Sequence, residues 1–163
     1  MGLAAPQIGI GRAAAVVQPP GDAPAIVLLN PRITTSCDET DEQYEGCLSF
    51  FGVRGLVPRP LKITVEATAL TGEPVTTLYE RGLARLIHHE IDHLEGLLYT
   101  ARMWTGIEPI PVEQYRQTGQ AWAYEQVTAW RTVQQPRLPF RASAIKAAHP
   151  CLEEPFARWK HPL

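Results

Sequence analysis

The stretch ERGLARLIHHEIDHLEG, residues 80–96, decides the fold of this chain. Its leucines and isoleucines recur at steps of three and four residues, which predicts a helix with one apolar face. Gly96 is the expected C-terminal stop of this helix. Residues 89–93 read HEIDH, an HExxH pattern. The helix predicted from the apolar spacing is therefore also the expected carrier of a metal site.

The two histidines of this pattern can act on one metal ion. His89 and His93 are four residues apart, so they project from the same face of the predicted helix. Two imidazoles placed in this way can bind one divalent ion, and Glu90 is positioned to take a proton from a water molecule held there. A helix that carries histidines on its polar side by chance is the alternative, and the strong amphipathic setting favours the metal site.

A catalytic metal site needs a third protein ligand and an open position for water. An HExxHxxGxxH pattern would supply a third histidine, but Tyr99 stands at that position. Glu108 and Glu113 could serve as the later carboxylate of a thermolysin-like site, although no motif surrounds either residue. Cys47, in the small-residue segment EGCLS at 45–49, is the remaining soft ligand. A buried structural cysteine is the alternative interpretation of Cys47.

Composition places the chain among ordinary globular domains. Its 163 residues fit one domain, with 45% apolar and 20% charged residues. The formal net charge of −2 argues against a duplex-binding protein, which usually carries a strong basic excess. No stretch approaches the roughly 18 apolar residues of a membrane span, and the first residues lack the basic start of a signal peptide. We therefore expect a cytoplasmic protein with neither nucleic acid nor membrane as a partner, whose three cysteines are thiols.

Short strands around one strong helix predict an α+β fold, with antiparallel sheets packed around a central HExxH helix. A second helix is expected over residues 111–130, followed from residue 131 by an irregular, proline-interrupted tail. Alternation and β-branched residues mark the strands, whereas glycine, proline and acidic clusters mark the loops. The expected strands are 13–17, 25–29, 62–69 and 97–102, and the expected irregular segments are the loops 2–11 and 37–43 and the strand and turn 45–60.

Three motifs occur in order along the chain: GLAAPQ at 2–7, EGCLS at 45–49 and HHEIDHLEG at 88–96. Together they resemble the three motifs of the peptide deformylase family, over about residues 2–103. The resemblance implies a metallohydrolase core at residues 1–103. This core would be N-terminally truncated, because family members normally carry further residues before the first motif. Residues 104–163 would be a C-terminal extension of the same domain.

The resemblance also implies roles for individual residues at the reacting centre. Cys47, His89 and His93 would bind the metal, and Glu90 would act first as general base and then as acid toward the leaving amine. The side chain of Gln7 and the backbone N–H of Leu48 would stabilise the oxyanion. An ordinary exposed loop amide is the alternative interpretation of Gln7.

Further residues would bind the substrate or orient the ligands. Gly2 and Gly46 would let the backbone approach an extended substrate. Arg54 occupies a place similar to a substrate-contacting arginine in relatives, with a surface salt bridge as the alternative. Glu45 and Asp92 would hold the metal ligands in position, although Asp92 could equally be a solvated helix residue. The walls of a pocket for the methionine side chain are expected from Leu48, Leu86 and Ile87.

The implied reaction is hydrolysis of the N-formyl group from N-formylmethionyl peptides or nascent chains, with release of formate. Fe²⁺ is the expected metal, because the family commonly works with it, and Zn²⁺, Ni²⁺ and Co²⁺ are alternatives. Three other functions stay open. They are a diverged paralogue that binds metal without efficient turnover, another HExxH peptidase, and a structural metal domain whose fourth ligand is His88 or Cys37.

Overall fold

A computed structural model of the chain describes residues 1–120 and 133–134. These residues form a six-stranded sheet in the order β1-β2-β3-β6-β7-β9 and a three-stranded sheet in the order β4-β5-β8, with every neighbouring pair antiparallel. The predicted α+β class is therefore confirmed. The elements are β1 (Gly2–Ala4), η1 (Ala5–Ile8), β2 (Ala14–Val17), β3 (Ile26–Ser36), β4 (Thr40–Cys47), β5 (Phe50–Pro60), β6 (Lys62–Thr68), β7 (Pro74–Glu80), α1 (Arg81–Leu94), η2 (Tyr99–Arg102), β8 (Ile110–Pro111), α2 (Val112–Gln117) and β9 (Val133–Gln134), where η denotes a 3-10 helix.

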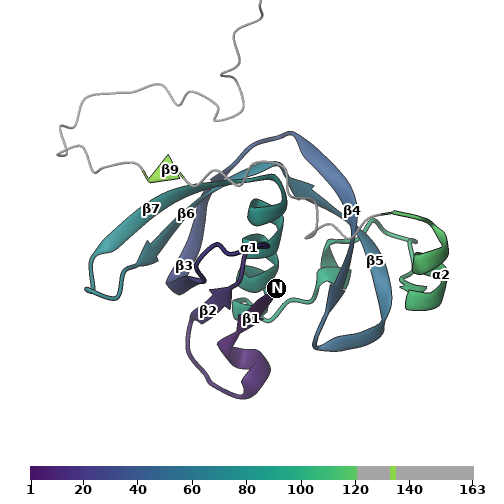
Figure 1. Ribbon diagram of the computed structural model, residues 1–163, viewed down its shortest axis with the longest axis horizontal. Coiled ribbons are helices and arrows are strands. Elements are labelled where there is room, and N and C mark those ends of the chain that lie inside the picture. The colour runs from purple at the N-terminus through teal and green to yellow at the C-terminus, as the bar shows by residue number, and fades with distance from the viewer. Residues whose placement is uncertain (121–132, 135–163) are drawn as a thin grey trace, which may run out of the picture.

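Helix α1 covers the helix predicted from the apolar spacing. Figure 1 shows it beside the six-stranded sheet, with β4, β5 and α2 on its other side. Leu83, Leu86, Ile87 and Ile91 are buried and form the hydrophobic core together with Ile63 and other apolar residues of the large sheet. The helix ends where the sequence predicts, because Gly96 has a φ of 77°, in the left-handed region that glycine adopts without strain.

The central strands of the large sheet follow the alternation of their sequence. On β6, Ile63 and Val65 are buried against α1, and the residues between them face away. The strand predicted at 62–69 is observed as β6, and the strands predicted at 13–17 and 25–29 are observed as β2 and as the first part of a longer β3. Period-two alternation is thus sufficient to locate strands with one buried face.

The prediction of irregular structure over residues 37–43 and 45–60 is wrong for most of these residues. Strands β4 and β5 form one long antiparallel hairpin, in which Cys47 pairs with Phe50 across a tight turn. The acidic residues of β4 do not prevent strand formation, because arginines neutralise two of them. Asp41 bonds to Arg85, and Glu45 bonds to Arg59 and Arg85. Neutralisation of these acidic residues by arginines distant in sequence thus outweighs their low propensity for β-strands.

Three smaller predictions are also corrected. The first loop contains strand β1 followed by η1, because Gly2 to Ala4 pair with β2. The strand expected over 97–102 is instead the 3-10 helix η2, which buries Tyr99. The second helix is much shorter than predicted within the described residues, since α2 ends at Gln117. Residues 121–130 of that prediction lie outside the described residues, as does the expected tail from residue 131 apart from β9.

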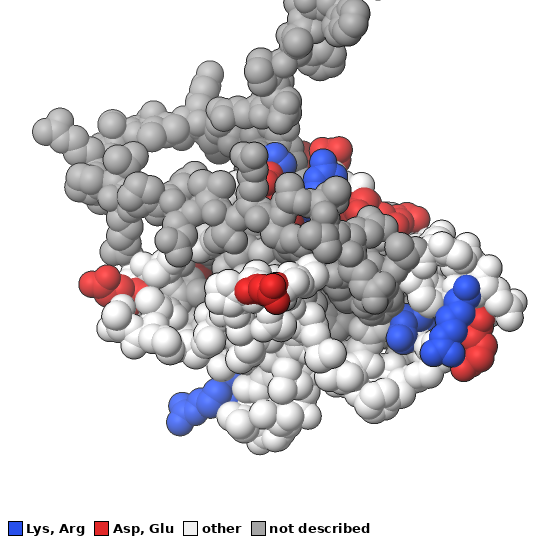
Figure 2. All heavy atoms as spheres, in the orientation of Figure 1, with Lys and Arg blue, Asp and Glu red and all other residues white. Residues whose placement is uncertain are grey.

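The surface of the described residues carries no extended region of one charge on the face that Figure 2 shows. Basic and acidic side chains are scattered there among uncharged residues. This distribution agrees with the small formal net charge of −2. Neither described helix has the length and apolar character needed to cross a membrane.

Candidate active site

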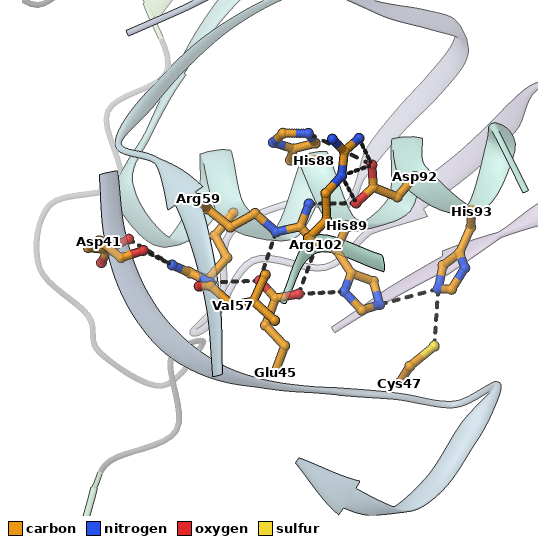
Figure 3. Close-up of polar contacts among 11 residues, drawn as sticks. Asp41, Glu45, Cys47, Val57, Arg59, His88, His89, Asp92, His93 and Arg102 are labelled. Carbon is orange, nitrogen blue, oxygen red and sulfur yellow. Dashed lines mark hydrogen bonds and ion pairs between the residues drawn. The ribbon is translucent and has the colours of Figure 1, made fainter. Parts of the chain in front are cut away.

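Helix α1 brings two imidazoles together. His89 and His93 lie one turn apart and are both buried, with ring centroids 4.8 Å apart and Nε2 atoms separated by 3.2 Å. The apolar face of α1 is fixed against the large sheet, so the face that bears the histidines points toward the β4–β5 hairpin. Figure 3 shows both rings pointing toward Cys47.

The turn of the hairpin supplies the sulfur. Cys47 is the last residue of β4, and its Sγ lies 3.1 Å from His93 Nε2. One ligand atom from each of Cys47, His89 and His93 falls within 4.8 Å of the others, so the three residues could hold one metal ion. They are the one such set found among the described residues. The structure thus brings together the three ligands predicted from the sequence.

The surroundings of Cys47 favour the thiolate, which is the form that binds metals. Partial burial raises the pKa of the thiol, but hydrogen bonds with His89 and His93 and from the backbone N–H of Ser49 outweigh this effect and lower the pKa to about 5. A thiolate and two imidazoles form a donor set suited to Fe²⁺, Zn²⁺, Ni²⁺ or Co²⁺. The donor chemistry therefore fits a catalytic metal ion.

No fourth protein ligand closes this set among the residues that the structure describes. The sulfur of Cys37 accepts the N–H of Lys62 and lies in a different part of the fold. The ring of His88 faces Asp92 on the side of α1 away from Cys47, as Figure 3 shows. Glu108 and Glu113, the candidates for a thermolysin-like ligand, do not belong to the set. Three protein ligands leave a coordination position for water or substrate, as in catalytic sites.

Glu90 has the properties of a proton carrier. Its side chain is buried beside the two histidines, and its Oε2 has no hydrogen-bond partner among the described residues. Burial raises the pKa of this carboxyl group. A raised pKa brings a carboxylate closer to the range in which it can both accept and return a proton near neutral pH.

A buried carboxylate orients one of the imidazoles. His89 Nδ1 donates to Glu45 Oε2 at 2.9 Å, which leaves His89 Nε2 directed toward Cys47 and His93. Burial raises the pKa of Glu45, but hydrogen bonds from His89 and Arg59 outweigh it and hold the pKa far below its usual range. Glu45 is therefore an anion fixed in place, as expected of a residue that orients a metal ligand.

Two buried arginines hold this carboxylate, and the sequence interpretation missed both. Arg59 of β5 donates twice to Glu45 at 2.9 Å and once to Asp92 at 2.6 Å, and Arg85 of α1 donates to Glu45 at 2.7 Å. Figure 3 shows the bonds of Arg59 and Asp92 connected through Glu45 to His89, from which the dashed lines continue to His93 and Cys47. Asp92 also accepts from Arg102 at 2.7 Å, so it is a buried part of the network rather than a solvated residue.

Gln7 is oriented by its own loop. Its Oε1 accepts the N–H of Ala4 at 2.8 Å, so its Nε2 points toward the hairpin turn, 3.0 Å from Ser49 Oγ and 3.7 Å from Cys47 Sγ. Leu48, the other oxyanion candidate, lies in the same turn. The structure therefore places both predicted oxyanion groups beside the metal ligands.

The two predicted glycines lie where a side chain has no room. A Cβ on Gly2 would overlap the carboxylate of Glu90, and a Cβ on Gly46 would lie 2.5 Å from an Arg54 nitrogen. Any larger residue at either position would therefore displace the side chain of Glu90 or Arg54. The role predicted for these glycines, to let the backbone approach an extended substrate, stays a prediction.

Two of the three possible metal ligands, together with Glu90, open onto one pocket. It has a volume of about 510 Å³, and its lining includes Cys47, His89 and Glu90 together with Gln7 and Leu48. Gly2, Gly46, Arg54 and Leu86 line it as well. Ile87 does not, because its side chain belongs to the hydrophobic core, so the expectation that it walls a methionine pocket is wrong.

Comparison with known proteins gives the family. A sequence model of the family described as Polypeptide deformylase matches residues 1–106. The chain belongs to the polypeptide deformylase family. It is 44% identical over 102 residues to a peptide deformylase of Natranaerobius thermophilus, a match that covers 63% of this chain and 65% of that relative. It is 42% identical over 106 residues to peptide deformylase 1B, chloroplastic/mitochondrial, of Arabidopsis thaliana, covering 63% of this chain and 39% of that relative.

Solved deformylase structures share the fold. A class I type b peptide deformylase from Acinetobacter baumannii, bound to Met-Ala-Ser, has a TM-score of 0.59 and 36% sequence identity, over 63% of this chain and 69% of that chain. The chain spans less than two thirds of the length of the N. thermophilus and A. thaliana relatives that it matches. The described residues 107–120 lie beyond the region matched by the family model.

Proposed function

We propose that this deformylase-family chain hydrolyses the N-formyl group of N-formylmethionyl peptides in a metal-dependent reaction and releases formate. The observation that carries the proposal is the convergence of Cys47, His89 and His93, beside the pocket that Cys47, His89 and Glu90 line. This set has three soft or borderline ligands, one carboxylate with a free oxygen, and space for a substrate. The family membership of residues 1–106 supports the same reaction.

Cys47, His89 and His93 would hold the metal, with Fe²⁺ as the proposed ion and Zn²⁺, Ni²⁺ or Co²⁺ as alternatives. When bound, such an ion supplies Lewis-acid polarisation and lowers the pKa of water. The fixed anion Glu45 keeps the proton of His89 on Nδ1, so that Nε2 is available as a ligand. The buried arginines keep Glu45 in this position.

Glu90 would carry the proton through the reaction. Its free oxygen accepts a proton from the attacking water, and the same carboxyl group then donates that proton to the nitrogen of the leaving peptide amine. The carbon–nitrogen bond of the formamide breaks, and the products are formate and a peptide with a free amino terminus. Burial of Glu90 excludes bulk water from the carboxyl group, so the proton stays available for the second step.

Gln7 and Leu48 would stabilise the negative charge that develops on the formyl oxygen. The Nε2 of Gln7 is directed toward the hairpin turn because its Oε1 is held by Ala4. The backbone N–H of Leu48 would be the second donor. Loss of one such donor typically reduces the rate by about a hundredfold to a thousandfold.

The proposal also assigns the parts of the chain. Residues 1–103 would be the catalytic core, with α1 as its central helix, and residues 104–163 would be an extension of the same domain. The expected substrates are formylated peptides or nascent chains, and the cytoplasmic location expected from the sequence stays a prediction.

The test is formate release by the full chain loaded with Fe²⁺ or Ni²⁺, with formyl-Met-Ala-Ser as substrate. We expect Glu90→Gln to lower kcat by about a hundredfold to ten-thousandfold while the bound metal is retained. Glu73→Gln is the matched control, because Glu73 is an exposed glutamate in the turn between β6 and β7. Equal formate release by the wild type and Glu90→Gln would overturn the proposal, and cleavage of an internal peptide bond would favour a peptidase instead.

A further inference from the structure

The segment that follows the family-matched region reaches the pocket. Strand β8 pairs with β5, with Ile110 opposite Arg54 and Pro111 opposite Val53. Val112, the next residue, is one of the residues that line the pocket. The region matched by the family model ends at residue 106, so this part of the wall belongs to the extension.

An aromatic contact holds Val112 in place. Tyr115, one turn after Val112 on α2, is buried, and its ring packs edge-on against Tyr44 of β4 with centroids 5.2 Å apart. The Tyr115 hydroxyl donates to the carbonyl of Gln120 at 3.0 Å. Helix α2 is therefore fixed to the hairpin at two points, the β8 pairing and the Tyr115 ring, and Val112 lies between them.

Val112 reaches the pocket from the first residue of α2. Figure 1 shows β4 and β5 between α1 and α2. Helix α1 contributes His89 and Glu90 to the pocket, the β4–β5 hairpin contributes Cys47 and Phe51, and α2 contributes Val112. Phe51 is an apolar side chain with 76% of its surface exposed.

The size of the pocket indicates which part of a peptide would meet this side. A volume of about 510 Å³ suits a ligand of several groups rather than a single side chain. If the formyl carbon lies beside Glu90, an extended chain advances by about 3.3–3.6 Å per residue and carries the next residue away from α1. That residue would then lie near Val112 and Phe51.

We infer that Val112 and Phe51 form an apolar rim that selects peptides with an apolar side chain directly after the formylmethionine. The inference rests on the proposed function and deepens it, because it names the substrate class that this chain prefers. Val112 acts as a specificity-determining residue by contacting the second side chain of the substrate. Removal of apolar contacts from such a pocket typically changes discrimination by about tenfold or more, and a partly open rim gives the lower end of this range.

The test uses the full metal-loaded chain and compares two substrates, formyl-Met-Leu-Ser and formyl-Met-Ser-Ser. We expect the wild type to have the higher kcat/KM for the leucine peptide. Val112→Ser should reduce the ratio of kcat/KM for the leucine peptide to kcat/KM for the serine peptide by about tenfold, through KM for the leucine peptide, with little change for the serine peptide. Val27→Ser is the matched control, since Val27 is a half-exposed valine on β3 outside the pocket, and it should keep the wild-type ratio.

The outcomes separate the two proposals. Formate release from neither peptide by the wild type would overturn the proposed function itself. Formate release from both peptides with the same ratio in Val112→Ser and Val27→Ser would overturn the role of Val112 alone. An equal decrease in kcat/KM for both peptides in Val112→Ser would also overturn this role, because it would show that Val112 supports the structure without selecting the substrate. If Val112→Ser proves too unstable to measure, Val112→Thr takes its place. This variant keeps the shape of the side chain but replaces one methyl group by a hydroxyl, so it should lower the preference for the leucine peptide to an intermediate value.

Discussion

Two polar clusters meet at His89, and they differ in how many of their polar atoms have a hydrogen-bond partner. The first, here called the ligand cluster, consists of Cys47, His89, His93 and Glu90 and opens onto the pocket. The second, called the ion network, consists of Glu45, Arg59, Arg85, Asp92 and Arg102 and lies behind it. Figure 3 shows Glu45 joining the two at His89.

Two glutamates illustrate the difference. Glu45 and Glu90 are both buried and both lie next to His89. Glu45 accepts hydrogen bonds from Arg59, Arg85 and His89 and has a strongly lowered pKa, whereas Glu90 keeps one oxygen without a partner and has a raised pKa. A satisfied carboxylate holds the structure, while an unsatisfied one is available for chemistry. Changes in the ligand cluster should therefore affect function, and changes in the ion network should affect stability.

The largest effect is expected from the ligand cluster. Cys47→Ser replaces the thiolate by a poor ligand, so the chain should lose its metal, and formate release should fall by on the order of a thousandfold or more. Cys47 lies in a half-exposed turn, and the free energy of unfolding of the metal-free protein should change by less than about 1 kcal/mol. Metal analysis and formate release measure the first effect, and urea unfolding measures the second.

Treatment of the wild type with a chelator is the matching control for Cys47→Ser. It should reproduce the loss of activity, and added metal should restore activity to the wild type but not to the variant. A variant that retains stoichiometric metal would remove Cys47 from the ligand set.

The ion network should respond in the opposite way. Arg59→Met leaves Glu45 and Asp92 buried without their shared cation, and loss of one partner from a buried pair costs about 3–5 kcal/mol of unfolding free energy. Urea unfolding of the metal-free proteins measures this difference. Arg32→Met is the control, because the Arg32–Glu66 pair is exposed and 3.6 Å long, and it should cost less than about 1 kcal/mol. Equal stability of the two variants would contradict the conclusion that the ion network stabilises the fold.

Gly2→Ala tests the ligand cluster without touching a metal ligand. The new Cβ would overlap the Glu90 carboxylate, so Glu90 must move. We expect formate release to fall by about tenfold to a hundredfold, equivalent to about 1.4–2.8 kcal/mol, because displacement of a reacting group by about 1 Å has an effect of this order. Metal content should stay unchanged. Gly11→Ala is the matched control, since a Cβ on Gly11 meets nothing within 4 Å.

The two clusters were not equally predictable from the sequence. The ligand cluster depends on residues within short motifs, and a spacing of four residues on an amphipathic helix is sufficient to bring His89 and His93 together. Helix α1 was predictable for the same reason, because its apolar period is regular and local. The role of Cys47 was accessible only through the EGCLS motif, since no local pattern indicates which distant turn reaches the helix.

The ion network could not be predicted in the same way. Arg85 lies between buried leucines on the apolar side of α1, where a charged residue is expected to point to solvent. Its burial depends on Asp41 and Glu45, which are 44 and 40 residues away and were expected in a loop and in an irregular strand and turn. The hairpin and the network determine each other, because β4 becomes a strand only when its acids are neutralised. A pairing of this kind has no local signal.

The smallest expected effect sharpens the comparison, because it separates the length of a hydrogen bond from its burial. Trp104 Nε1 donates to Glu42 Oε1 at 2.6 Å, the same distance as Arg59 to Asp92 in the ion network. Trp104 is 58% exposed, whereas Arg59 is completely buried. When Trp104→Phe removes the donor, water can reach Glu42, so we expect a loss of less than about 0.5 kcal/mol in urea unfolding. A loss comparable to that of Arg59→Met would mean that short bonds stabilise this fold wherever they lie, and burial would then no longer explain why the ion network supports the structure.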